Sequence, residues 1–225
     1  MFQAEAMLEL VNAQALDAAL GALHDWRNTN RAHVTIEVDV NDLSGAQASL
    51  GEAVPADGSQ IPDMIIVIFA EREADVVDAV ASLSSALKGI AGSKTRILGE
   101  QRHEILSADG AVRLFYALSR LPGMSRRDFQ HYWLNTHAEF GRRFIPPYSY
   151  IQAHTDGDFT AMLCGCSGWA ASAFDGVVAV HFPDLEAAQR QLSQDYVTTI
   201  ALEDERRFID HSRVQMGFYS VKAFD

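Results

Sequence analysis

Residues 113–137 read RLFYALSRLPGMSRRDFQHYWLNTH, and this stretch predicts a strand, a tight turn and a helix in immediate succession. The apolar run Val112–Ser119 is typical of a strand, and the Leu-Pro-Gly sequence that ends at Gly123 is typical of a turn. Ser125 is a favourable helix N-cap, and Asp128 three positions later gives a start that resembles a capping box. The stretch therefore predicts the opening β-α unit of a mixed α+β fold.

The rest of the second half continues this order of elements. We expect strands at Tyr148–His154, Phe174–Phe182 and Arg213–Lys222, and helices at Asp184–Ser193 and Thr198–Asp210. Together these elements give residues 108–225 a β-α-β-β-α-β order, which is that of a ferredoxin-like unit.

Residues 1–107 show the same order of elements. Strands are expected at Glu5–Val11, His33–Val40, Asp63–Ala70 and Thr95–Leu106, with one helix after an N-cap at Asn12, a second helix at Glu73–Leu87, and a polar loop over residues 41–62. A ferredoxin-like unit carries both helices on one face of its sheet, so its other face must be covered. We therefore expect tandem βαββαβ repeats, 1–107 and 108–225, that pack their open faces together around a space for a ligand.

The composition excludes several classes of partner. The chain has a formal net charge of −12, so we expect neither nucleic acid nor an anionic membrane surface as a partner. The sequence has no apolar run long enough to cross a bilayer and begins with no signal-like segment, and we therefore expect a cytoplasmic protein.

The cysteines and the missing signatures argue against a metal or a nucleotide. Cys164 and Cys166 are separated by one residue, which is a poor spacing for zinc, and we expect small residues in a loop there. The sequence lacks the glycine-rich phosphate-binding patterns, the Gly-x-Ser-x-Gly elbow and the His-Glu-x-x-His zinc motif. We therefore expect chemistry without a cofactor or a metal.

Four blocks follow one another in the second half: residues 113–137, which include the pattern Phe-x-x-Tyr-Trp-x-x-x-His, and the runs 150–154 (YIQAH), 174–176 (FDG) and 204–208 (DERRF). With these blocks the second half resembles the EthD domain family, most clearly over residues 111–222. The resemblance implies the dimeric α+β barrel superfamily. That superfamily includes cofactor-free lyases, cyclases, dehydratases, isomerases and small monooxygenases, with haem-binding relatives. The first half resembles the family only in element order, and would replace the partner subunit as a degenerate half.

The helix after Ser125 places one stripe of residues on its inner face. The stripe consists of Phe129, Tyr132, Trp133, Thr136, His137 and Phe140. His137 is thus expected to point inward near the end of the helix, where the macrodipole favours its protonated form. The alternative is a core histidine bonded to a backbone carbonyl, and an aromatic stripe at this spacing is also typical of plain core.

The strand that ends at His154 carries a polar row. Alternation places Tyr148, Tyr150, Gln152 and His154 on one face and Ser149, Ile151 and Ala153 on the other. Because small and aliphatic residues suit packing against helices, we expect the polar row to face the barrel interior. Unpartnered polar groups are costly to bury, so the row suggests a wet or ligand-bound chamber; the alternative is a solvent-exposed edge.

These residues suggest a catalytic site. Imidazole can act as acid or base near neutral pH, so His137 and His154 form the expected acid–base pair. Asp204 is expected to orient one of them or to serve as the base, unless it belongs to an exposed acidic helix. The expected substrate-binding residues are Tyr132, Trp133, Tyr148, Tyr150, Gln152 and Phe208. His24 lies twelve residues after Asn12, as His137 lies twelve after Ser125, through duplication or by chance.

Two functions remain open from the sequence. The first is a cofactor-independent lyase, dehydratase-like, or an isomerase that acts on a small apolar oxygenated or aromatic metabolite by histidine acid–base catalysis. The second is a non-catalytic protein that binds a hydrophobic metabolite or haem, or accompanies a catabolic oxidase. Two tandem chains could also associate as a homodimer.

Overall fold

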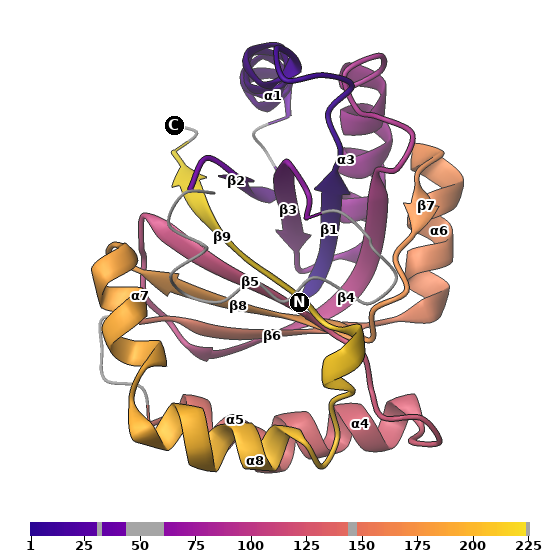
Figure 1. The fold of residues 1–225 in the computed structure, drawn as a ribbon. Helices are drawn as coiled ribbons and strands as arrows, with labels where there is room; N and C mark the ends of the chain where they lie inside the picture. Colours follow the sequence, from indigo (N-terminus) through magenta and orange to yellow (C-terminus); the bar gives the residue numbers. More distant parts are fainter. Residues whose placement is uncertain (31–32, 44–60, 144–147, 224–225) are drawn as a thin grey trace.

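The computed structural model describes residues 1–30, 33–43, 61–143 and 148–223 (Figure 1). Its strands are β1 (Phe2–Leu8), β2 (Thr35–Val40), β3 (Met64–Ala70), β4 (Arg96–Leu106), β5 (Val112–Leu118), β6 (Tyr150–Thr155), β7 (Ala170–Ala171), β8 (Gly176–Phe182) and β9 (Gln215–Lys222). Its longer helices are α1 (Ala15–Thr29), α3 (Glu73–Ala86), α4 (Arg126–Tyr132), α6 (Gly157–Ser167) and α7 (Leu185–Leu192). Shorter segments are α5 (Ala138–Gly141), α8 (Leu202–Glu205), the 3-10 turn η3 (His211–Arg213) and the π-helical turns η1 (Trp133–His137) and η2 (Tyr196–Ala201). Most of the predicted loop at 41–62 lies outside the described residues.

The strands close into an antiparallel barrel. Their order is β1-β3-β2-β9-β5-β8-β6-β4, and β4 returns to pair with β1. The two halves meet at two seams, one between β2 and β9 and the other between β4 and β6. The short β7 pairs in parallel with the start of β4. The predicted tandem α+β barrel is therefore confirmed, and the boundary expected at residues 107 and 108 falls in the connection between β4 and β5.

Helices cover the outside of the barrel at two opposite ends (Figure 1). On the first half, α1, α3 and α6 pack on the sheet through residues such as Leu23, Val80 and Phe159. On the second half, the α4-η1-α5 run and the η2-α8 run lie side by side against the sheet, with Phe129 and Phe208 in that core. Each strand thus has one face under helices and one face toward the barrel interior.

Helix α6 corrects the expectation of a loop around the cysteines. Asp156 caps the helix by accepting hydrogen bonds from the backbone N–H groups of residues 158 and 159, at 3.0 Å each. Gly168 ends the helix with a positive φ of 74°, as is common for a C-terminal glycine. Cys164 and Cys166 lie inside this helix and pack partly against the first-half core. The helix was not predicted because its small residues weaken the amphipathic pattern by which a helix is recognised in a sequence.

The N-termini of α4 and α1 show whether the two predicted N-cap residues cap these helices. The Ser125 hydroxyl accepts the backbone N–H of Asp128 at 3.1 Å, so the predicted N-cap is confirmed. The first helix instead begins after Gln14, and Asn12 accepts the Gln14 N–H at 3.0 Å in the preceding turn. Asn12 therefore stabilises the approach to the helix rather than its first turn.

The prediction that the polar row of β6 faces the barrel interior was wrong. Ala153 packs inside the barrel with Phe115 and Tyr219, whereas Tyr150 packs under the helices with Trp133. The large rings of Phe115 and Tyr219 occupy this part of the interior, so β6 presents the small residue Ala153 to them. The row Tyr150, Gln152 and His154 is buried on the helix-covered side.

The barrel interior holds a buried charge network. Arg113 is 1% exposed, and its guanidinium lies 2.8 Å from Glu5 Oε1 and 2.5 Å from Asp39 Oδ2. Burial raises the pKa of Asp39 to about 7, against the opposing charge of Arg113, and burial also raises the pKa of Glu5 and Glu100. Arg113 is thus the cation that permits carboxylates in the interior.

Gly176 is required where Trp133 crosses β8. A Cβ there would lie 2.5 Å from Trp133 Cζ3 and 2.7 Å from the backbone oxygen of Ala153. We expect Gly176→Ala to lower the free energy of unfolding by about 1–3 kcal/mol through overpacking. The control Gly165→Ala, in an exposed part of α6 with no atom within 4 Å, should raise stability by up to about 1 kcal/mol. Urea unfolding measures both, and equal midpoints for the two variants would contradict this packing.

Candidate functional site

A cavity of about 440 Å³ lies between the outer face of the second-half sheet and its helices. Its floor comes from β5, β8 and β9, and its roof from η1, α5, η2 and α8. Most of its lining is apolar and includes Leu114, Val178, Val180, Leu192, Val214 and Met216. The volume falls within the range of about 300–1,000 Å³ that is usual for small-molecule sites. We call this space the helix-side cavity.

His137 is the histidine that the second-half helix brings to this cavity. Its Nδ1 lies 2.8 Å from Asp204 Oδ2, and Asp204 Oδ1 accepts the Tyr132 hydroxyl at 2.7 Å. The Phe208 ring packs 5.0 Å from the imidazole, between ring centroids. A carboxylate only accepts hydrogen bonds, so Nδ1 carries the proton and Nε2 is the basic nitrogen of the neutral ring. Within the described part of the chain, Nε2 makes no hydrogen bond.

Both π-helical turns line the helix-side cavity. His137 is the last residue of η1, and η2 contributes Tyr196, Val197, Thr198 and Ala201. A π turn inserts an extra residue into a helix and changes the direction of its side chains, and such turns are frequent at functional sites. Helical periodicity in a sequence does not predict π turns. The helix predicted over Thr198–Asp210 consists of η2 followed by α8.

A second acid–histidine pair lies at the same cavity. Glu205 Oε2 is 2.9 Å from His211 Nε2 and accepts the Tyr116 hydroxyl at 3.4 Å. Burial raises the pKa of Tyr116 well above its ordinary value, so this phenol stays protonated. The neighbours Asp204 and Glu205 thus each hold one histidine at the cavity. Glu205 and His211 were not among the predicted site residues, although Glu205 lies within the 204–208 block that supported the family resemblance.

The predicted site residues divide into two groups. Five of them belong to the neighbourhood of His137: His137 and Tyr150 line the helix-side cavity, and Asp204, Tyr132 and Phe208 surround the imidazole. Burial raises the pKa of Tyr150 to about 12. The other four, Trp133, Tyr148, Gln152 and His154, do not line the cavity. Tyr148 packs on Phe182, with 5.2 Å between ring centroids.

His154 is buried against Trp133 and Gln152 and does not line the helix-side cavity. Its ring stacks on Trp133 with 4.5 Å between centroids, and its Nε2 lies 3.1 Å from Gln152 Oε1. Gln152 in turn donates to the Trp133 carbonyl at 3.1 Å and to the Tyr150 hydroxyl at 3.0 Å. Burial, with a smaller effect of His103, lowers the pKa of His154 to about 3. The expected pairing of His154 with His137 is therefore not formed, and His154 stays neutral.

Three other sequence features were compared with the described residues: His24, possible metal ligands and possible membrane-spanning helices. His24 is exposed on α1, so it does not match the buried His137 of the second half. Within the described residues, no group of three or more histidine, cysteine, aspartate or glutamate side chains is placed to hold a metal ion. Over the same residues, no helix combines the length and the apolar character that crossing a bilayer requires.

Fold and cavity together define the class: a tandem ferredoxin-like α+β barrel with a small-molecule-sized cavity in its second half. Residues 121–212 match the family model of the EthD domain. The resemblance seen in the sequence is confirmed. No curated protein matches the chain.

Solved structures share the whole fold. A candidate monooxygenase from Fusobacterium nucleatum aligns with a TM-score of 0.59 and 8% identity, covering 100% of this chain and 92% of its own. A dye-decolorizing peroxidase from Bacteroides thetaiotaomicron gives 0.55 and 8%, covering 97% and 92%. A chlorite dismutase from Candidatus Nitrospira defluvii, solved with imidazole, gives 0.55 and 8%, covering 97% and 90%. At these identities the likeness concerns the fold alone.

Proposed function

We propose that the protein binds a small, largely apolar oxygenated or aromatic molecule in the helix-side cavity and catalyses proton transfer next to its carbonyl group. The observation that supports this most directly is the pairing of His137 Nδ1 with Asp204 at 2.8 Å beside an apolar cavity. In such a site, a neutral imidazole with a fixed tautomer is suited to act as a general base.

The proposed reaction begins with removal of the proton on the carbon adjacent to the carbonyl. His137 Nε2 takes this proton, and Asp204 stabilises the imidazolium that results, while Tyr132 holds the second oxygen of Asp204. An enolate forms, and His211, when both of its ring nitrogens carry a proton, stabilises the enolate oxygen from its position beside Glu205. If the proton returns to another carbon of the same molecule, the reaction is an isomerisation. For a dehydratase, the C–OH bond on the next carbon breaks and the hydroxyl group leaves as water with a proton from the doubly protonated His211; neither route needs a cofactor.

Deuterium exchange tests this proposal without knowledge of the natural substrate. 1-Tetralone is an aromatic ketone with exchangeable hydrogens next to its carbonyl, and proton NMR in D₂O follows their loss. We expect the protein to accelerate exchange above the buffer rate, and we expect Glu37→Gln, a change on the interior side of the barrel, to leave that acceleration intact. Exchange at the buffer rate for 1-tetralone and for a panel of other cyclic ketones would overturn the proposal.

Haem binding is the second candidate function. A histidine whose Nδ1 is bonded to a carboxylate is also a suitable axial ligand, because the carboxylate fixes its orientation and raises its basicity. His137 would hold the iron, and a bound haem would supply redox chemistry. Among the described lining residues, no lysine or arginine is available to pair with the haem propionates, so this candidate ranks second.

Haemin titration separates the two candidates. If haem binds, the Soret band should shift and saturate at one haem per chain, and His137→Ala should lose the shift while His24→Ala, an exposed control, retains it. An unchanged spectrum removes the haem candidate. For the accessory role, no small molecule should raise the melting temperature, because tight binding always stabilises the native state. A cytoplasmic location and a homodimer of the tandem chain stay predictions.

A further inference from the structure

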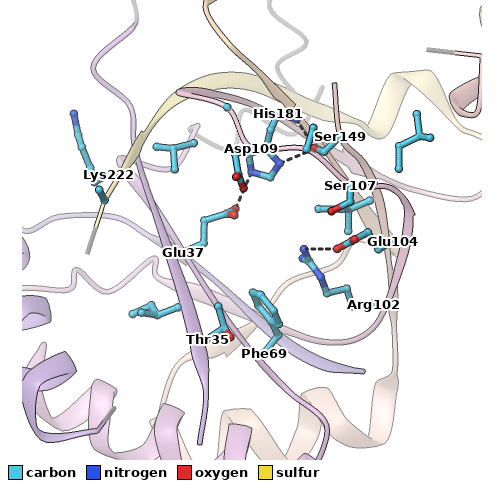
Figure 2. A pocket seen from close by; sticks show the side chains of 17 residues that line it. Thr35, Glu37, Phe69, Arg102, Glu104, Ser107, Asp109, Ser149, His181 and Lys222 are labelled. Carbon is cyan, nitrogen blue, oxygen red and sulfur yellow. Dashed lines mark hydrogen bonds and ion pairs between the residues drawn. The ribbon is translucent and has the colours of Figure 1, made fainter. Parts of the chain in front are cut away.

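A second cavity of about 400 Å³ opens on the interior side of the barrel (Figure 2). Strands β2, β4, β8 and β9 line it, together with residues 107–110 and the start of β6. The sheet separates it from the helix-side cavity: Tyr150 and Val180 face the helices, whereas their neighbours Ser149 and His181 face this space. We call it the barrel-mouth cavity, and the proposed function above does not use it.

Glu37 presents an ionised carboxylate to this cavity. Its Oε1 lies 3.2 Å from His181 Nε2 and 3.5 Å from a guanidinium nitrogen of Arg113, and its side chain is 21% exposed. Although burial raises the pKa of Glu37, the contact with His181 and the charge of Arg113 lower it to about 2. Its second oxygen, Oε2, makes no hydrogen bond to any residue that the structure describes.

His181 is held rigidly beside Glu37. Ser149 Oγ accepts the His181 backbone N–H at 2.8 Å and lies 2.8 Å from the imidazole Nδ1. Because the Glu37 carboxylate 3.2 Å from Nε2 only accepts hydrogen bonds, Nε2 carries a proton, and the serine hydroxyl can then donate to Nδ1. The side chain is 6% exposed, yet Nε2 has no well-angled hydrogen-bond acceptor among the described residues. This N–H lies against Glu37 Oε1, so the acceptor that remains for a donor-only group such as an ammonium is Glu37 Oε2.

The cations near the cavity are already paired. Arg113 is paired with Glu5 and Asp39, and Lys222 Nζ lies 2.7 Å from Asp42 Oδ2. Positive charge from these two side chains is therefore not available to a ligand.

Arg102 is also engaged. It donates to Gln3 Oε1 at 2.9 Å, and its guanidinium lies 4.4 Å from the centroid of the Phe69 ring. Glu104, 3.8 Å from Arg102, and Asp109 add acid at the rim, so the lining carries an excess of negative charge. Figure 2 shows Glu37 and Arg102 on opposite sides of the space. A negative field in a cleft with apolar walls favours a cationic ligand.

We propose that the barrel-mouth cavity binds a small organic cation with a primary ammonium group. The ammonium donates to Glu37, and the apolar part of the ligand contacts Phe69, Leu106 and Ile151. Because the lining comes from both sides of the β2–β9 and β4–β6 seams, such a ligand would contact both halves of the barrel.

Calorimetric titration of the full chain with 2-phenylethylamine tests the proposal. We expect saturable binding of one amine per chain at neutral pH, with much weaker binding of the neutral 2-phenylethanol and of the anionic 3-phenylpropanoate. Glu37→Gln should weaken amine binding about ten- to hundredfold, the usual effect of losing a hydrogen bond to a charged group.

Matched variants locate the effect. Glu104→Gln removes an exposed rim carboxylate and should change the dissociation constant about fivefold at most. His137→Gln, in the helix-side cavity, should leave amine binding unchanged. Leu106→Trp fills the cavity without removing a charge and should abolish binding even where Glu37→Gln fails to fold. The proposal is overturned if the amine does not bind at millimolar concentration, if the anion binds more tightly, or if both cavity variants bind like the parent.

Discussion

Replacement of Arg113 by methionine should lower the free energy of unfolding by about 3–5 kcal/mol at pH 8, because it leaves buried carboxylates without their cation. Arg113 is 1% exposed and contacts Glu5 and Asp39 directly. Urea unfolding measures the loss. The control Arg190→Met, which removes an exposed helical pair with Glu186, should cost less than about 1 kcal/mol.

The loss should shrink at lower pH. Burial raises the pKa of Asp39 to about 7, and removal of Arg113 would raise it further. A carboxyl with a raised folded-state pKa contributes stability that is complete below its unfolded pKa and is lost as pH rises through the folded pKa. The variant should therefore recover stability between pH 8 and pH 5. A loss below about 1 kcal/mol at pH 8 would show that the interior does not need this cation.

Replacement of His137 by glutamine should lower the rate of ketone deuterium exchange about 10²- to 10⁴-fold, the usual contribution of a positioned general base. Asp204→Asn should have a smaller effect because the base remains but loses its fixed tautomer and its counter-charge. Tyr132→Phe should have the smallest effect of the three, since it removes only the hydrogen bond to the second Asp204 oxygen.

His154→Gln is the matched control for this series. His154 is a buried neutral histidine that is bonded to Gln152 and stacked on Trp133, so its replacement should reduce stability but leave the exchange rate near that of the parent. A loss of exchange in His154→Gln as large as that in His137→Gln would contradict this assignment and support the acid–base pair of His137 and His154 that the sequence suggested.

Much of the fold could be predicted because its signals are local. The strand alternation before Val40, the Ser125 cap and the repeated β-α-β-β-α-β order each depend on neighbouring residues alone, and together they specify two ferredoxin-like halves. The inward direction of His137 followed in the same way from helical spacing. The structure places its Nδ1 2.8 Å from Asp204 Oδ2, and the role of Asp204 in orienting the imidazole stays a prediction.

The location of the site could not be predicted because it depends on distant contacts. Alternation shows that Tyr150, Gln152 and His154 share a face of β6, but not which face lies inside a closed barrel. The two π turns and the approach of His211 to Glu205 arise from packing between separate segments. The candidate site therefore lies on the helix-covered side and not in the barrel interior, and its lining includes His137 but not His154.

Nitrogen-15 NMR of the histidine side chains during titration with 1-tetralone shows whether a ketone binds beside His137. We expect a saturable shift of the His137 Nε2 signal, which is lost in a Tyr150→Trp variant that obstructs the helix-side cavity, with no comparable shift at His154. A titration that leaves His137 unchanged, or that shifts His154 instead, would contradict this expectation.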